Sequence, residues 1–193
     1  YKEKLDSSVY RSALIMKPVF EASRSSPRRL VFAEGEDERV LRAAFAMSEE
    51  TIDRPILIGR PEVIASRAAR SGIPLNTDNY EIVNPESDPR YRDYWETYHG
   101  LMARRGVTPD LARAIMRTNT TAIGAVMVNR GEADSLICGT FGQYLWHLNY
   151  IEQVLGGQGR KPIGALSLMI LESGALFIAD THVHPEPSAE QIA

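Results

Sequence analysis

Three short polar segments contain the residues that could take part in chemistry. Glu34-Gly35-Glu36-Asp37-Glu38 directly follows the apolar run 29–33, and its carboxylates could orient a ligand or bind a cation. Thr118-Asn119-Thr120-Thr121 offers side-chain oxygens of the kind that cap a helix N-terminus. Cys138-Gly139-Thr140 ends a short apolar run ahead of another helix-like segment. A strand that ends in small residues before a helix is where open α/β sheets place ligands.

Each candidate also has a purely structural interpretation. The acidic segment at 34–38 could simply start a helix, since carboxylates in a first turn favour the helix dipole. Cys138 has no evident histidine partner, so a small packed residue is favoured over a nucleophile. Strand alternation puts Asp180, His182 and His184 on one face, but a polar strand end is favoured there and no metal site is predicted. No nucleotide-binding glycine fingerprint, phosphate-binding loop or paired-cysteine motif is present.

The elements that must position these residues alternate between strand and helix. Strands are expected at 29–33, 55–59, 80–84 and 135–138, and helices at 37–50, 60–71, 89–105, 108–117, 122–129 and 143–155. A further helix starts after Ser7 or Ser8 and breaks at 25–28. The runs 163–171 and 175–183 could form a hairpin or a longer parallel arrangement. The alternation from Arg29 to Cys138 predicts an α/β fold, a parallel sheet with helices on both faces.

Composition excludes several classes of function. A formal net charge of −3 argues against a general nucleic-acid binder. The longest apolar runs fall well short of the roughly 20 residues that a membrane span needs. The charged N-terminal residues do not resemble a signal peptide, and one cysteine cannot form an internal disulfide. We therefore expect a cytoplasmic protein with neither nucleic-acid nor membrane partners.

Five longer segments resemble the phosphate acetyltransferase (phosphotransacetylase) family. They are VFAEGEDERVLRAA at 31–44, VNP at 83–85, YHGLMARRGVTPDLA at 98–112, GAVMVNRGEAD at 124–134 and ADTHVHPEPSAEQIA at 179–193. The stretch RTNTTAIGAVMVNRGEADSLICGTFGQY is most similar to the version fused to the C-terminal end of bacterial NADP-dependent malic enzymes. The resemblance covers essentially the whole chain. The family domain is longer, so the sequence is expected to be a fragment.

The resemblance implies a three-layer, mostly parallel phosphotransacetylase-like fold of the isocitrate/isopropylmalate dehydrogenase-like type. It implies a first α/β domain at 1–139 and the beginning of a second at 140–193, with a cleft between them. Candidates for the cleft wall lie in the turns 34–38, 118–120 and 138–140, and they are Glu34, Gly35, Asp37, Thr118, Asn119, Thr120, Cys138, Gly139 and Thr140.

The resemblance also implies that acetyl-transfer chemistry has been lost. Active members have a His-Thr-Thr group and a later arginine after the strand-end turn. Here Gly142, Gln143 and Tyr144 occupy the first three positions, and Asn149 occupies that of the arginine. A phosphoryl substrate needs positive charge or dense N–H donors. No catalytic residue is therefore expected in this chain.

The implied function is a regulatory and oligomerisation module of a malic enzyme. Its effector would be acetyl-CoA or another acyl-CoA, and its partners a malic enzyme domain on the N-terminal side and further copies of itself. That absent domain would decarboxylate malate with NADP and Mg or Mn, while this chain would hold no cofactor. The alternatives are an active phosphate acetyltransferase and a purely structural oligomerisation domain.

Overall fold

The computed structural model describes residues 16–49, 54–74, 80–156, 163–171, 174–181, 183–184 and 186–189. The chain divides into two compact units, Ser23–Leu155 and Tyr1–Ala22 with Gly156–Ala193. The first unit contains the sheet and most of the helices. The predicted boundary at residue 140 concerns the complete domain and stays a prediction.

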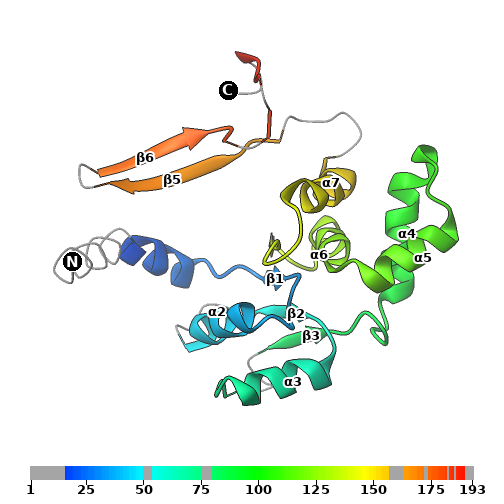
Figure 1. Ribbon diagram of the computed structural model, residues 1–193, viewed down its shortest axis with the longest axis horizontal. Helices are drawn as coiled ribbons and strands as arrows, with labels where there is room; N and C mark the ends of the chain where they lie inside the picture. Colours follow the sequence, from blue (N-terminus) through cyan, green and yellow to red (C-terminus); the bar gives the residue numbers. More distant parts are fainter. Residues whose placement is uncertain are drawn as a thin grey trace. The chain divides into compact units, whose positions relative to one another are not determined.

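The core of the larger unit is a four-stranded parallel sheet (Figure 1). Its strands are β1 (Leu30–Phe32), β2 (Ile56–Ile58), β3 (Glu81–Val83) and β4 (Ser135–Ile137). They lie in the order β3-β2-β1-β4, with Val31 opposite both Ile56 and Leu136. All four predicted strands are confirmed, and β4 adds to β1 from about a hundred residues further along the chain.

Helices cover both faces of this sheet, as Figure 1 shows. They are α2 (Glu38–Glu49), α3 (Pro61–Arg70), α4 (Tyr91–Met102), the 3₁₀ turn η2 (Ala103–Arg105), α5 (Pro109–Thr118), α6 (Thr120–Asn129) and α7 (Tyr144–Leu155). Successive strand residues point to opposite faces, so Phe32 packs with α2 and α3 while Val31 packs with α4 to α7. The predicted three-layer α/β fold is confirmed.

Local sequence signals set several helix ends. Thr108 caps α5 by accepting a hydrogen bond from the Leu111 amide at 3.2 Å, and Pro109 follows at the first helical position. Asn119 caps α6 through the Ala122 amide at 2.9 Å, so α6 begins two residues earlier than expected. The helix expected over 89–105 is shorter, because α4 ends at Met102 and η2 follows.

The aromatic face of α4 belongs to the core. Tyr94 and Tyr98 are fully buried, whereas Tyr91 and Trp95 pack at the edge. The guanidinium of Arg117 lies 3.6 Å from the centre of the Tyr91 ring. Tyr94 and Tyr98 are therefore core residues.

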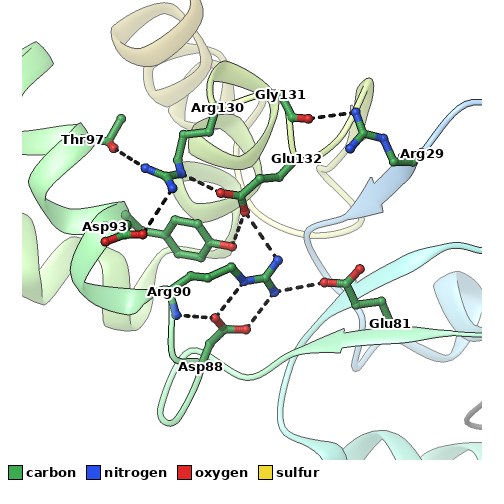
Figure 2. A network of polar contacts seen from close by, with 10 residues as sticks. Arg29, Glu81, Asp88, Arg90, Asp93, Thr97, Arg130, Gly131 and Glu132 are labelled. Carbon is green, nitrogen blue, oxygen red and sulfur yellow. Dashed lines mark hydrogen bonds and ion pairs between the residues drawn. The ribbon is translucent and has the colours of Figure 1, made fainter.

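A polar network around Glu132 ties α4 to the turn between α6 and β4 (Figure 2). Glu132 Oε2 accepts the Tyr94 hydroxyl at 2.7 Å, and Glu132 Oε1 accepts from Arg130 at 2.6 Å. Arg90 reaches the same carboxylate at 3.5 Å and pairs with Asp88 at 2.9 Å. These contacts join segments about forty residues apart.

The smaller unit contains an antiparallel hairpin of β5 (Leu166–Leu171) and β6 (Gly174–Ala179). This outcome confirms the hairpin alternative. Every residue of both strands except the partly buried Ser167 is exposed. Residues 16–25 are helical, while the predicted beginning of that helix lies outside the described residues. Within the described part of the chain, no helix is long and apolar enough to cross a membrane.

Candidate functional site

The carboxyl ends of the strands surround one cavity of about 420 Å³. Its wall comes from the loops after β1, β2, β3 and β4, together with α3, α5 and α6. The lining residues are Ala33, Glu34, Glu36, Asp37, Ile58, Gly59, Arg60, Arg67, Pro85, Glu86, Arg117, Thr120 and Phe141. A cavity of this size at this edge of a parallel sheet suits a small-molecule site.

Gly35 lets the loop after β1 lie directly against β2. Its amide donates to the Ile58 carbonyl at 3.0 Å. A Cβ added at Gly35 would stand 2.8 Å from that oxygen and 2.9 Å from Leu57 Cβ. Gly35 therefore supports the site by close packing, and its amide is already used.

Glu36 and Arg60 form a two-pronged ion pair at the cavity. Glu36 Oε1 accepts from Arg60 Nε and from the Arg60 amide, both at 2.9 Å, and Oε2 accepts from Nη2 at 3.0 Å. The hydrogen bond from the Arg60 side chain holds the pKa of the Glu36 carboxyl below its ordinary value. The charges of Glu36 and Arg60 cancel each other, and the pair connects the loop after β1 to the start of α3.

Two other arginines at the cavity form no salt bridge among the described residues, although the charge of Arg67 helps to lower the pKa of the Glu36 carboxyl. Arg67 donates to the Glu36 carbonyl at 2.8 Å, and Arg117 donates to the Pro85 carbonyl at 2.7 Å and to that of Glu86. Backbone carbonyls hold these guanidinium groups but carry no net charge to cancel theirs. Each also keeps unused N–H donors, which suits it to an anion.

Arg67 also borders a second hollow of about 420 Å³ between α2 and α3. The other lining residues are Glu38, Arg42, Arg70 and Ser71. Three arginines face one carboxylate there, and Glu38 is paired with Arg42 at 2.7 Å. Positive charge therefore predominates in this second hollow.

A cluster of buried polar side chains lies where β1 and β4 end. Glu34 Oε1 accepts the Gly139 amide at 2.9 Å. His147 Nε2 lies 2.8 Å from the Phe141 carbonyl, and Nδ1 lies 2.8 Å from the Thr121 hydroxyl. Because a carbonyl only accepts, Nε2 carries a hydrogen and donates it to the Phe141 carbonyl. His147 thereby fixes the loop after β4 to α6 and α7.

Cys138 is poorly suited to act as a nucleophile. Burial and the nearby Glu34 carboxylate raise the pKa of its thiol, although a hydrogen bond with Thr121 opposes the shift. A thiol must ionise to attack, and reactive cysteines have lowered pKa values. This agrees with the structural interpretation of Cys138.

The structure brings only some of the predicted cleft residues to the cavity. Glu34, Asp37 and Thr120 line it. Gly139 lies beside it through its bond to Glu34, and the Thr140 carbonyl accepts from Arg39 at 2.7 Å.

Thr118 and Asn119, by contrast, serve their own helices. Thr118 donates back to the Ala114 carbonyl at 3.0 Å, and the buried Asn119 caps α6. Neither residue is among those that line the cavity, and their place in the wall of the cleft between domains stays a prediction. The hydroxyl and amide groups of these two residues are as well suited to helix capping as to binding a ligand.

Sequence reasoning missed His147 and the three arginines of the cavity, whose wall also carries the carboxylates of Glu34, Glu36, Asp37 and Glu86. Arg60, Arg67 and Arg117 sit in or beside helical segments, where periodicity alone predicts a solvated face. His147 carries no motif. Cationic side chains thus remain at the cavity, although the position that active family members fill with arginine is the exposed Asn149.

No group of three potential metal ligands is found among the described residues. Asp180 Oδ2 lies 2.9 Å from His184 Nδ1, so this carboxylate is used within the chain. His182, the third member of the predicted pattern, lies outside the described residues.

Comparison with known proteins identifies the class. The family model for phosphate acetyl/butaryl transferases matches residues 14–193, and the chain belongs to this family. Within it, the chain is similar to malic enzymes. It is 53% identical to an NAD-dependent malic enzyme of Rhizobium meliloti and 46% identical to an NADP-dependent malic enzyme of Escherichia coli.

These matches cover 100% of this chain but 26% of each malic enzyme. The chain therefore spans about a quarter of the length of the curated relatives it matches. A phosphate acetyltransferase of Synechocystis is 30% identical, again over 100% of this chain and over 28% of that protein. The sequence is thus closer to the malic enzymes named above than to this transferase.

Solved structures show the same fold. A phosphotransacetylase from Streptococcus pyogenes matches with a TM-score of 0.76 at 23% identity, covering 91% of this chain and 54% of that one. A phosphotransacetylase from Staphylococcus aureus matches with a TM-score of 0.73 at 21% identity, covering 86% and 50%. The predicted phosphotransacetylase-like architecture is confirmed.

Proposed function

We propose that this chain is the C-terminal regulatory module of a malic enzyme and that its strand-end cavity binds acetyl-CoA or a related acyl-CoA. The observation that carries the proposal is the pair Arg67 and Arg117, two guanidinium groups at one cavity that form no salt bridge among the described residues. Acyl-CoA compounds carry several phosphate charges. The neighbouring second hollow, which shares Arg67, adds Arg42 and Arg70.

The loop after β4 supports binding without acetyl transfer. Gly142 has a φ of 92°, and a Cβ there would lie 3.0 Å from His147 Nε2. The position therefore favours glycine and offers no side chain for catalysis. Gln143, Tyr144 and Asn149, which occupy the other compared positions, are exposed. This chain would bind the ligand and signal its presence.

Malate decarboxylation would belong to a malic enzyme domain on the N-terminal side, working with NADP and Mg or Mn. The effector would act by binding one state of the whole enzyme better than another. A tenfold preference corresponds to about 1.4 kcal/mol.

The module would also hold copies of the enzyme together. The hairpin supports this part, because its apolar side chains are exposed on both strands. A two-stranded hairpin is at best marginally stable alone, so it needs something to pack against. A second copy of the chain is the occupant we propose.

The test measures malate-dependent reduction of NADP and NAD by the complete enzyme and by a version lacking this module, each titrated with acetyl-CoA. We expect acetyl-CoA to alter the rate only when the module is present. Equal responses, or none, would remove the regulatory role. Acetyl-CoA formation from acetyl phosphate would overturn the non-catalytic assignment.

Two arginine variants locate the site. Arg67→Gln removes a charge at the cavity, and we expect it to raise the acetyl-CoA concentration for half effect about tenfold or more, since charge-assisted hydrogen bonds are strong. Arg113→Gln is the matched control, because Arg113 stacks on Trp95 at 4.2 Å and does not line the cavity. The same shift in both variants would argue for a general charge effect.

A further inference from the structure

Two buried side-chain atoms without a hydrogen-bond partner lie in the turns that follow β1 and β4. They are Glu34 Oε2 and Thr140 Oγ1, the unpartnered atoms of this kind among the described residues. The bond from the Gly139 amide to Glu34 Oε1, at 2.9 Å, joins the two turns. Buried polar groups are almost always paired, so two unpaired ones in neighbouring turns need an explanation.

No side chain among the described residues donates a hydrogen bond to Glu34 Oε2. His147 Nδ1 lies 4.0 Å from Glu34 Oε1, beyond hydrogen-bond distance, and its hydrogen bond is with the Thr121 hydroxyl. The other ring nitrogen is used by the Phe141 carbonyl. Asn119 is committed to the α6 cap. A partner for Glu34 Oε2 must therefore come from outside this cluster.

Glu34 also belongs to the wall of the cavity, although its side chain is only 2% exposed. The same wall carries Arg67 and Arg117. At Glu34 the cavity has an acceptor atom without a hydrogen-bond donor, whereas at Arg67 and Arg117 it has donors that can hold an anion. A ligand made only of anionic groups would leave Glu34 unpaired and meet its negative charge.

We propose that Glu34 Oε2 accepts a hydrogen bond from an uncharged N–H or O–H group of the ligand, and that the Thr140 hydroxyl pairs with the same part of it. The cavity then selects ligands that combine such a donor with an anionic group. This inference rests on the proposed function, in which the amide and hydroxyl groups of the pantetheine arm are the donors and the phosphates are the anions. Glu34 thus determines specificity and takes no part in bond making.

The experiment is calorimetric titration of the complete protein with two probes. Acetyl-CoA has the pantetheine arm, and 3′-phospho-ADP keeps the phosphates without it. Glu34→Gln retains the oxygen that accepts from Gly139 but presents an amide N–H₂ in place of Oε2. We expect this variant to bind acetyl-CoA 10- to 100-fold more weakly than wild type, because the new amide N–H₂ would face the N–H or O–H donor of the pantetheine arm. Its affinity for 3′-phospho-ADP should stay within about twofold of wild type.

Two further variants keep the inference falsifiable. Glu62→Gln is the matched control, because it removes the same charge from an exposed position on α3 that does not line the cavity, and we expect both probes to bind it as they bind wild type. Thr140→Val removes the unpaired hydroxyl while the backbone carbonyl still accepts from Arg39. We expect a several-fold loss for acetyl-CoA alone, even if Glu34→Gln fails to fold.

The outcomes separate this inference from the proposed function. If wild type binds neither probe, the proposed function fails and this inference fails with it. If wild type binds acetyl-CoA and the Glu34 and Thr140 variants bind it equally well, only this inference is overturned, and water is the partner of the two atoms. Equal weakening for both probes would also overturn it, because Glu34 would then not sense the pantetheine arm.

Discussion

At the scale of single residues, Gly35 is a position where one added methyl group should disturb the site. A Cβ there would lie 2.8 Å from the Ile58 carbonyl and 2.9 Å from Leu57 Cβ, both on a buried strand. Backbone cannot move aside as a flexible side chain can. We expect Gly35→Ala to lower the free energy of unfolding by about 1–3 kcal/mol, measured by urea denaturation.

Gly100→Ala is the matched control for Gly35. Gly100 lies within α4 and has nothing within 4 Å of an added Cβ. Alanine should therefore stabilise the chain there by about 0.5–1 kcal/mol, the usual difference in helix propensity. If the two variants change stability equally, close packing is not what selects glycine at Gly35.

Asp37 should make stability depend on pH in the acid range. Hydrogen bonds from the Arg39 side chain and amide lower the pKa of Asp37 from its ordinary 3.8 to about 2. Because the folded pKa is lowered, the stabilisation is complete above pH 3.8 and is lost as the pH falls through about 2. Acid unfolding of wild type should therefore show this contribution disappearing between about pH 4 and 2.

The Arg39 amide near the start of α2 donates to Asp37 Oδ1 at 2.9 Å. Asp37→Asn tests the charge and keeps a side-chain oxygen for this bond, since asparagine caps a helix as well as aspartate does. We expect it to cost about 1 kcal/mol at pH 7, and the difference from wild type should vanish near pH 2. Asp110→Asn serves as control, because Asp110 is 93% exposed in its pair with Arg113. A difference at Asp37 that stayed constant with pH would show that charge is not responsible.

At the scale of elements, the network in Figure 2 should contribute to the free energy of unfolding by holding α4 against the turn between α6 and β4. Tyr94 exposes 2% of its surface and donates to Glu132 Oε2 at 2.7 Å, and burial with this contact raises the pKa of its hydroxyl. Tyr94→Phe removes a buried hydrogen bond to a charged group. We expect a loss of about 1.5–3 kcal/mol in denaturant unfolding.

Tyr91→Phe gives the comparison on the same helix. The Tyr91 hydroxyl donates to the Arg113 carbonyl at 3.0 Å in an exposed contact. Its loss should cost about 0.5–1 kcal/mol, the usual net value of a neutral hydrogen bond. Hydrogen exchange of the α4 amides should also quicken more for Tyr94→Phe, and similar rates in both variants would contradict a special role for Glu132.

The elements themselves were largely predictable, because their signals are local. Thr108-Pro109 and the apolar run at 56–58 determine a helix start and a strand from a few neighbouring residues. The site was only partly predictable. Strand ends pointed to Glu34 and Asp37, but the arginines reach the cavity through contacts such as Arg117 to Pro85, 32 residues away. Such pairs depend on tertiary packing, which periodicity does not encode.

At the scale of the whole molecule, the hairpin is the feature most in need of a partner. Its strands pair from Leu166 opposite Ala179 to Leu171 opposite Gly174. Leu168 and Phe177 face each other in that ladder and are 43% and 61% exposed. Contiguous apolar surface of this kind marks interaction sites in soluble proteins.

We expect the 193-residue chain to self-associate through this surface. The double variant Leu168→Lys/Phe177→Lys should raise the dissociation constant of the dimer at least tenfold, measured by sedimentation equilibrium. Two lysines on opposing positions would repel each other and the same charges on a second copy. Leu111→Lys/Leu155→Lys adds equal charge at exposed leucines of α5 and α7, so it controls for net charge. If both double variants dissociate alike, charge explains the effect. A wild-type chain that is monomeric at high micromolar concentration would show that copies of this chain do not cover the hairpin.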